Sequence, residues 1–451
     1  MIKNRIVSVW CVILSLSSAW LIQPARAALD VDDIPMAARM VLAETTKLMQ
    51  RKTYDRAIAV LTAFQAKGKA LTVAVQPDPK GYHHPALYYY LGNCYLLLKK
   101  HAQAGEAYRH AVEQDPDFVE AWTNLAKTYF EQEDFVRAAP CFATAYEKSD
   151  QRVADNLYFS AVSYLMADQY RSSISAFQRL FKSHPDRITL HWRAHFAQAL
   201  LAGGRTHRAL PLIRILAEAS TGEDQVKWRE TLLYQYLQLE MRAEAMAYAT
   251  ELTRKECTRA LWWKALAHVR LSGGSYKEAL TALTLYSYLT PLTKTEKKLW
   301  ADLNLQLNLP ARAMEQYRAL LSQQFDRDCL KNLVSACQRL EQYKEGLDQL
   351  NRYAPDTDDV ELLMLKADML YDLKQYAEAG ALFCRVAQSR TSRSGQAWLM
   401  AGYAAWQRND WTAGRRAFQK AACHRPFRKA ARLAMRRMEE TIHHGINSSG
   451  G

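Results

Sequence analysis

A regular spacing of small residues runs through almost the whole chain of 451 residues. These positions hold alanine, serine or glycine, and they are Ala57, Ala104, Ala138, Ser173, Ala209, Ala245, Ala279, Ala313, Gly346, Ala379 and Gly414. Successive members lie 47, 34, 35, 36, 36, 34, 34, 33, 33 and 35 residues apart. A period of roughly 20 to 50 residues is typical of an array in which one supersecondary unit repeats. The chain is therefore expected to stack similar units in a row, although its length alone would suggest about three globular domains.

Other residues recur at fixed offsets around these positions. One unit holds Tyr88, Leu91-Gly92, Tyr95, Ala104, Tyr108, Ala111 and Pro116, and a late unit holds Trp398, Ala401-Gly402, Ala405, Gly414, Phe418, Ala421 and Pro426. This pattern resembles the tetratricopeptide repeat family, whose unit is a helix–turn–helix of about 34 residues. The resemblance implies an all-α, right-handed superhelical solenoid of about eleven such units over 28–426, closed by a C-terminal capping helix. The low content of glycine (17) and proline (13) favours helices joined by short loops.

Two segments depart from the repeat. The first unit is weak, and about 13 extra residues near 67–85 are expected to form a surface loop or, alternatively, a loop that binds a partner. After the last unit, 427–444 is expected to form a basic capping helix, and 445–451 a disordered tail. The apolar side of this capping helix is expected to carry Ala430, Leu433, Ala434, Met438 and Ile442.

The N-terminal residues have the order of a secretory signal peptide. Lys3 and Arg5 precede an apolar run from Ile6 to Ile22, and Ala25-Arg26-Ala27 provides a small-residue cleavage site. Removal of 1–27 would leave an exported, periplasmic protein. The alternative is a retained N-terminal anchor, because the apolar run is nearly long enough to span a bilayer.

The positive charge is concentrated at one end of the chain. The formal net charge is +14, of which 1–27 carries +3, 28–384 carries +1 and 385–451 carries +10. The cations of this basic terminal patch are Arg415, Arg416, Lys420, Arg425, Arg428, Lys429, Arg432, Arg436 and Arg437. For an exported protein, anionic lipid, lipopolysaccharide phosphates or an acidic protein segment fit better than nucleic acid. A charged cap that only aids solubility is the alternative.

The family resemblance also implies a groove lined by fixed positions of each first helix. Carried over residue by residue, early units place Tyr89, Asn93, Thr123, Lys127 and Tyr158 there. In later units the fifth helix position is Lys264, Lys298 and Lys331, which are 34 and 33 residues apart. Such lysines would form a ladder for an acidic extended peptide or an anionic polymer. Alternatively, they only solvate the wall of the groove.

Motifs for catalysis or metal binding are weak. His191 and His195 have the i, i+4 spacing of a metal pair, but the sequence offers no obvious third ligand. Ser272-Gly273-Gly274-Ser275 lacks the frame of a phosphate loop and falls where a unit must turn. Seven cysteines remain after the signal, none in a C-x-x-C pair, and most are expected to be small buried residues. No catalytic residue, cofactor or metal is expected.

These observations favour a non-enzymatic periplasmic scaffold that binds a protein of an envelope complex. The chain looks similar to exported repeat proteins that accompany the ExbB/ExbD/TonB energy-transducing apparatus, which implies a role as an accessory of TonB-dependent uptake. One alternative is a scaffold for polysaccharide export or outer-membrane assembly. Another is direct binding of an anionic glycan or lipid. The oligomeric state is left open.

Overall fold

The computed structural model describes residues 34–69, 78–389 and 391–448. These residues form 23 α-helices and two short 3-10 turns, and no strand occurs among them. The chain divides into two compact units, Met1–Gln235 and Tyr236–Gly451. The signal peptide predicted over 1–27 lies outside the described residues.

Ten helices lie entirely in the first unit. They are α1 (Met36–Gln50), α2 (Tyr54–Lys69), α3 (Pro85–Leu97), α4 (His101–Gln114), α5 (Val119–Glu131), α6 (Phe135–Lys148), α7 (Ala154–Met166), α8 (Tyr170–Ser183), α9 (Leu190–Ala202) and α10 (Thr206–Ala219). A 3-10 turn, η2 (Pro185–Arg187), separates α8 from α9, and α11 (Gly222–Gln238) spans the division between the units.

The remaining helices belong to the second unit. They are α12 (Arg242–Lys255), α13 (Ala260–Ser272), α14 (Tyr276–Leu289), α15 (Lys294–Gln306), α16 (Pro310–Gln323), α17 (Arg327–Arg339), α18 (Tyr343–Tyr353), α19 (Val360–Asp372), α20 (Tyr376–Gln388), α21 (Ser394–Gln407), α22 (Trp411–Cys423) and α23 (Arg428–Ser448). The 3-10 turn η3 (Arg425–Phe427) lies between the last two.

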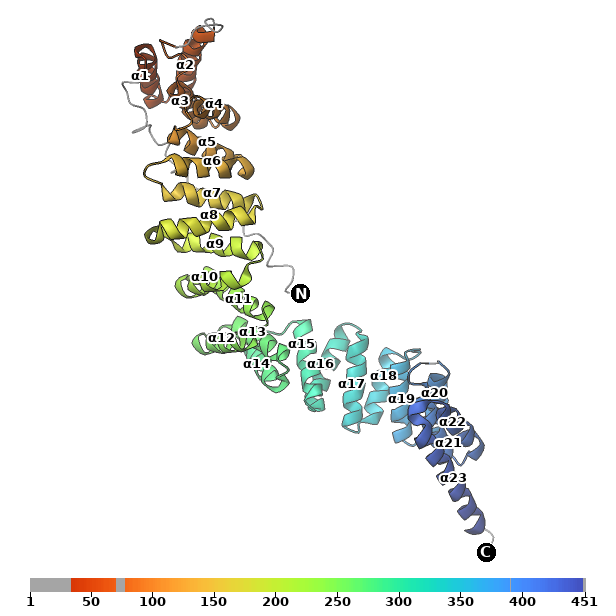
Figure 1. Ribbon diagram of the computed structural model, residues 1–451. Helices are drawn as coiled ribbons and strands as arrows, with labels where there is room; N and C mark the ends of the chain where they lie inside the picture. Colours follow the sequence, from red (N-terminus) through yellow and green to blue (C-terminus); the bar gives the residue numbers. More distant parts are fainter. Residues whose placement is uncertain (1–33, 70–77, 390, 449–451) are drawn as a thin grey trace. The chain divides into compact units, whose positions relative to one another are not determined.

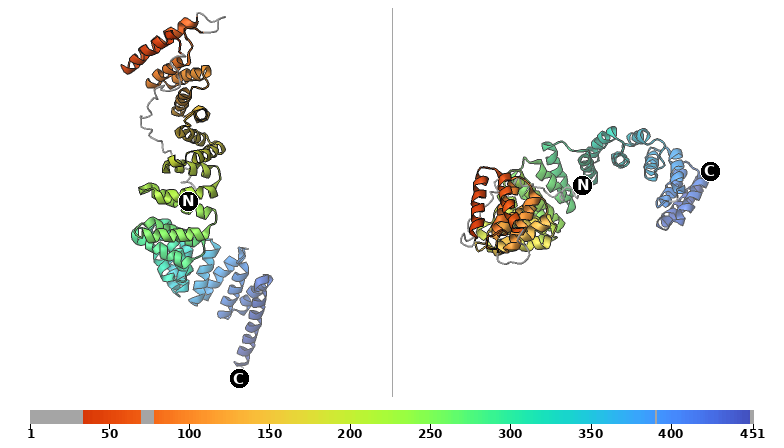
Figure 2. Two further views of the ribbon diagram at one scale, coloured as in Figure 1. Left: turned by 60° about the vertical axis from the view of Figure 1, so that its left-hand side comes forward. Right: turned by 90° about the horizontal axis from the view of Figure 1, so that it is seen from above.

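The helices alternate in chain order as eleven successive twos, from α1 and α2 to α21 and α22, with α23 after the last. In every two except α11 and α12, the first helix packs against the second. Within each unit, neighbouring helices contact one another from α1 to α10 and from α12 to α23, as Figures 1 and 2 show. Contacts also join several odd-numbered helices to the next odd-numbered helix, such as α15 to α17 and α17 to α19. We call the odd-numbered helices of each unit, α1 to α9 in the first and α13 to α21 in the second, the odd-helix layer of that unit. The predicted all-α repeat solenoid of about eleven units with a capping helix is confirmed.

The small residues that set the period all have the same place in the fold. Each of the eleven is the fourth residue of an even-numbered helix, and each is buried. A large side chain there would hold the second helix of a pair away from the first. The close approach of the two helices therefore accounts for the alanine, serine or glycine at every repeat.

The turn inside each pair also has one conformation. The residue two positions before every even-numbered helix has a positive φ, and these residues are Lys52, Lys99, Glu133, Asp168, Gly204, Glu240, Gly274, Asn308, Glu341, Lys374 and Asn409. Glycine suits this left-handed position best, because it has no Cβ to clash with the backbone. Gly274 thus marks the turn between α13 and α14, as predicted for Ser272–Ser275.

Aromatic rings fill the space beside glycines in the first helices. A Cβ on Gly92 of α3 would lie 2.6 Å from the Tyr108 ring of α4. A Cβ on Gly402 of α21 would lie 2.5 Å from the Phe418 ring of α22. Both rings are fully buried. The recurring glycine and aromatic residue are therefore two halves of one contact inside a pair.

The loop and the cap differ in detail from the expectation. Between α2 and α3, Tyr82 is buried with its ring centroid 4.8 Å from that of Phe64, so the described part of the loop packs on the repeat. The capping helix continues to Ser448, beyond the predicted end at 444 and into the predicted tail.

The apolar face predicted for the capping helix was partly wrong. Ala434 and Met438 are buried as expected, and Ala431 is buried with them. Ala430 is exposed and Leu433 is 48% exposed. The buried face is rotated by about one residue from the predicted one. The contact with α22 sets which side of the helix is buried, and periodicity alone does not define this rotation.

Candidate binding surface

The fifth position of the first helix connects neighbouring pairs. Its predicted members are Tyr89, Thr123 and Tyr158 in the first unit and Lys264, Lys298 and Lys331 in the second, and we call these six residues the fifth-position row. Each of them bonds to a side chain of the following pair. The row therefore lies along the odd-helix layer, as its spacing indicates, and links successive pairs to one another.

In the first unit these links are neutral hydrogen bonds between buried groups. The Asn124 amide donates to the Tyr89 hydroxyl (3.3 Å) and to Asn93 Oδ1 (3.2 Å), and Asn93 Oδ1 also accepts from the Tyr108 hydroxyl (2.6 Å). One pair further on, the Asn156 amide donates to Thr123 Oγ1 (3.3 Å). Because buried polar groups are costly unless they are paired, this network fixes how α3, α5 and α7 are aligned.

Tyr158 has the same role between α7 and α9. Its hydroxyl lies 2.8 Å from His195 Nδ1, and its ring stacks on Trp192 with centroids 4.8 Å apart. Burial, together with the nearby His191 ring, lowers the pKa of His195 to about 4. His195 is therefore a neutral, buried packing residue, and the described residues hold no group of three or more ligands that could bind a metal ion.

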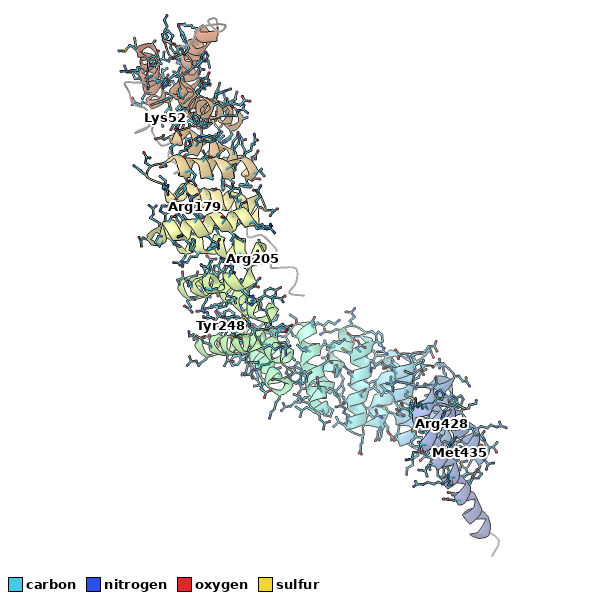
Figure 3. All side chains as sticks on the ribbon, viewed as in Figure 1. Lys52, Arg179, Arg205, Tyr248, Arg428 and Met435 are labelled. Carbon is cyan, nitrogen blue, oxygen red and sulfur yellow. The ribbon has the colours of Figure 1, made fainter. Side chains whose placement is uncertain are left out.

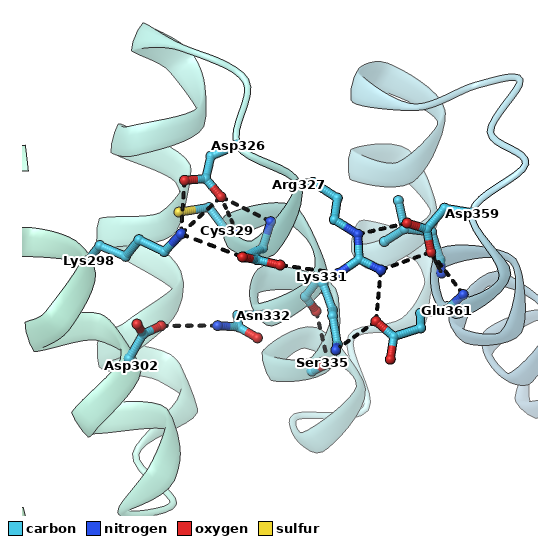
Figure 4. A network of polar contacts seen from close by, with 12 residues as sticks. Lys298, Asp302, Asp326, Arg327, Cys329, Lys331, Asn332, Ser335, Asp359 and Glu361 are labelled. Carbon is cyan, nitrogen blue, oxygen red and sulfur yellow. Dashed lines mark hydrogen bonds and ion pairs between the residues drawn. The ribbon is translucent and has the colours of Figure 1, made fainter. Parts of the chain in front are cut away.

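In the second unit the links are ion pairs. Lys264 lies 2.7 Å from Glu296, Lys298 lies 2.9 Å from Asp326, and Lys331 lies 2.8 Å from Glu361. Each acid stands at the start of the next odd-numbered helix, and Figure 4 shows the second and third of these pairs. An acid also suits a helix N-terminus, where the unpaired N–H groups carry partial positive charge.

The pKa values follow from this geometry. Burial alone would raise the pKa of Glu296, but the Lys264 ammonium and the Thr293 N–H outweigh it and lower this pKa to about 2. The Glu296 carboxylate in turn raises the pKa of Lys264. Lys331 and then Arg327 lower the pKa of Glu361. The three lysines are thus charge-compensated within the fold.

Arg327 extends the network at the start of α17. It donates to Asp359 (2.7 Å) and to Glu361 (2.7 Å), and Arg393 lies 3.6 Å from Glu361. Figure 4 shows Arg327 reaching across to the acids that begin α19. This set of charges ties α17 to α19 and the start of α21.

The predicted groove contacts therefore need correction. Tyr89, Asn93, Thr123 and Tyr158 are at most 7% exposed, so they lie beneath the surface and not on an open wall. Lys127 on α5 is partly exposed. Burial lowers the pKa of Lys127, and the Glu131 and Asp155 carboxylates raise it by a smaller amount. Lys264, Lys298 and Lys331 recur on α13, α15 and α17, but each ammonium already faces a carboxylate of the following pair.

The compensating acids were missed by sequence reasoning, although the sequence contains a signal for them. Thr293 and Glu296 form a capping box that is recognisable from the spacing Thr-x-x-Glu. Asp326 and Asp359 are N-caps of α17 and α19. An acid at each helix start, 28 to 32 residues after each lysine, indicates that the next pair compensates the lysine.

The basic terminal patch lies at the end of the second unit. All nine of its cations are exposed, on α22, η3 and α23. Arg415 pairs with Glu439 (3.1 Å), and the Lys420 ammonium lies 4.1 Å from the centre of the Trp398 ring. Figure 3 labels Arg428, the first residue of α23.

The cysteines behave mainly as packing residues. Cys94, Cys141, Cys329 and Cys337 are buried, Cys384 is partly buried, and all are free thiols, as are the exposed Cys257 and Cys423. Burial raises the pKa of Cys94 and that of Cys141 to about 12, which keeps both as neutral thiols. Among the described helices, none is both long enough and apolar enough to cross a membrane.

Comparison with known families identifies part of the repeat. Residues 85–118 and 107–139 match models described as tetratricopeptide repeat. These residues include α3, α4, α5 and the start of α6, so this part of the chain is similar to tetratricopeptide repeats. No curated protein matches the sequence.

Several solved structures are similar at low identity. One is a tetratricopeptide repeat protein from Parabacteroides merdae ATCC 43184, with 14% identity, a TM-score of 0.31, and coverage of 66% of this chain and 98% of that chain. The TPR domain of P58(IPK) has 13% identity, a TM-score of 0.24, and coverage of 80% and 99%. Naa15/Naa10 bound to HypK-THB has 14% identity, a TM-score of 0.41, and coverage of 86% and 68%. None of these likenesses carries a functional argument for this chain.

Proposed function

We propose that the chain is a non-enzymatic scaffold of the bacterial periplasm, and that it holds a protein of an envelope complex on its odd-helix layer. The observation that carries this proposal is the elevenfold repetition of one helix pair, with similarity to tetratricopeptide repeats over 85–139. A stack of such pairs buries its core between neighbours and offers an extended surface, which suits binding of a long partner segment.

The corrected site geometry changes which part of the layer meets the partner. The fifth-position row is occupied by contacts between pairs, so the partner contacts the side chains that lie beside this row. Lys127 on α5 is one such residue, and Ser335, one turn after Lys331 on α17, is another. The partner need not be acidic, because the lysines of the row are compensated.

The envelope role proposed for the scaffold is that of an accessory of TonB-dependent uptake. It rests on the resemblance to exported repeat proteins, in which an order of charged, apolar and small residues like that over 1–27 is followed almost directly by degenerate repeats. The expected mature protein begins at Ala28, and N-terminal sequencing of protein from a periplasmic fraction measures this. A mature chain that retains Met1 would contradict cleavage.

Affinity purification from an envelope fraction tests the pathway. We expect the tagged mature protein to recover components of the ExbB/ExbD/TonB type. Recovery of polysaccharide-export or outer-membrane-assembly proteins instead would contradict the role in TonB-dependent uptake, but it would agree with a protein-binding scaffold. Recovery of no protein after crosslinking in intact cells would contradict the scaffold itself.

A further inference from the structure

The cations of α23 that face away from the repeat form a stripe. Ala431, Ala434 and Met438 are buried against the last pair. At 100° per residue, Lys429, Arg432 and Arg436 lie within about 60° of one another on the opposite side of the helix. We call these three residues the cationic stripe.

No carboxylate within the described residues forms an ion pair with the stripe, although Glu440 lies one turn after Arg436 on the same side of α23. The neighbouring acid Glu439 pairs with Arg415 of α22. Within the described residues, Lys429, Arg432 and Arg436 form no ion pair, and all three are exposed. The stripe therefore differs from the lysines of the fifth-position row, each of which faces a carboxylate from the next pair.

The shape of the surface restricts its partner. The stripe lies on the outer side of a helix that packs through its other side, so it is a convex ridge and not a groove for a peptide. Arginine forms paired hydrogen bonds with phosphate, and anionic lipid headgroups attract clusters of lysine and arginine. Leu433 is 48% exposed beside the stripe and adds one apolar side chain at the same face. Because the main apolar face of α23 is used inside the fold, the contact would be peripheral and would not involve insertion of the helix.

We propose that the cationic stripe of α23 docks this end of the second unit on an anionic phospholipid surface. The contact is electrostatic and sensitive to salt, and it leaves the odd-helix layer available to a protein partner. This inference concerns a different surface from the proposed function, so either one can fail without the other.

Co-sedimentation of the full mature chain with vesicles tests the proposal. The vesicles contain phosphatidylglycerol and phosphatidylcholine, or phosphatidylcholine alone. The test variant is Lys429→Gln/Arg432→Gln/Arg436→Gln. The control variant is Lys277→Gln/Arg312→Gln/Lys344→Gln, which removes three exposed cations from α14, α16 and α18. Circular dichroism checks that both variants retain their helix content.

The native chain and the control are expected to bind the anionic vesicles, and binding should fall as salt is raised. The stripe variant is expected to bind roughly 100-fold more weakly, because each cation near an anionic membrane contributes about a fivefold gain in affinity. Equal binding of the two variants would overturn the role of the stripe. Equal binding of the native chain to both vesicle types would overturn the anionic surface. If the native chain does not bind the anionic vesicles but does bind poly-glutamate, the membrane proposal is overturned in favour of an acidic protein as the partner of the stripe.

Discussion

At the residue scale, Glu361 is the carboxylate that the most cations share in the described network. Arg327, Lys331 and Arg393 all approach it, from α17 and from the start of α21. Its side chain is 33% exposed, so water weakens each pair, but the shared geometry holds three cations in place. Glu361 therefore contributes to the alignment of neighbouring pairs more than an isolated surface acid would.

Replacing Glu361 by Gln should destabilise the second unit by about 1 to 2 kcal/mol, because three cations lose their common partner. Glu315→Gln is the matched control, since Glu315 is exposed on α16 and has no partner among the described residues. It should change stability by less than about 0.5 kcal/mol. Thermal unfolding followed by circular dichroism measures both. Equal shifts in Tm for the two variants would contradict the proposed network.

Asp368 is a residue whose charge works against the fold at neutral pH. Burial and then the nearby Asp372 carboxylate raise the pKa of Asp368 to about 6. An acid with a raised folded-state pKa favours folding below its unfolded pKa of about 3.8, and this contribution is lost as pH rises through about 6. Asp368→Asn should therefore raise Tm at pH 7.5, by an amount that corresponds to about 1 to 2 kcal/mol, and the gain should vanish near pH 4.

Asp348→Asn, on the exposed side of α18, is the control for this pH dependence. Its effect on Tm should be small, because the side chain is exposed. A gain for Asp368→Asn that persists unchanged at pH 4 would show that the effect does not come from ionisation of Asp368.

At the element scale, the helix pair is the part of the structure that sequence reasoning predicted best. The small residue at the fourth position of each even-numbered helix must fit against the first helix, so its identity repeats with the period. The rotation of α23 was not predictable in the same way. Its apolar residues allow two faces one residue apart, one through Ala430 and Leu433 and the other through Ala431 and Ala434. The contact with α22 selects the second.

The same substitution should have opposite effects at two glycines of neighbouring helices. In α21, Gly402→Ala places a methyl group 2.5 Å from the Phe418 ring, so it should destabilise by about 1 to 3 kcal/mol. In α20, Gly380→Ala meets only the Ala404 methyl at 3.6 Å, which is ordinary contact. It should stabilise by about 0.5 to 1 kcal/mol, because alanine favours a helix interior. Tm values that move in the same direction would contradict the packing inside α21 and α22.

At the scale of the whole molecule, the division into two compact units was not apparent from the period. It falls between Gln235 and Tyr236, inside α11, where the spacing of small residues is 36 on both sides of Ala209. The repeat continues through this region, so spacing alone does not mark a boundary. The site was predictable to a similar degree. The period predicted that the fifth-position row lies on the odd-numbered helices. Whether a polar side chain of this row bonds to the next pair depends on the geometry between residues about 30 positions apart, which the period does not define.

Site-specific photo-crosslinking measures most directly whether the odd-helix layer holds a protein partner. The crosslinker is placed at Lys127 and Ser335 on odd-numbered helices, and at Glu106 and Glu315 on the exposed sides of even-numbered helices. In intact cells, we expect both odd-helix positions to crosslink to the same envelope protein and both even-helix positions to give at most a trace. If the partner crosslinks at Glu106 and Glu315 but not at Lys127 or Ser335, the proposed binding surface is contradicted.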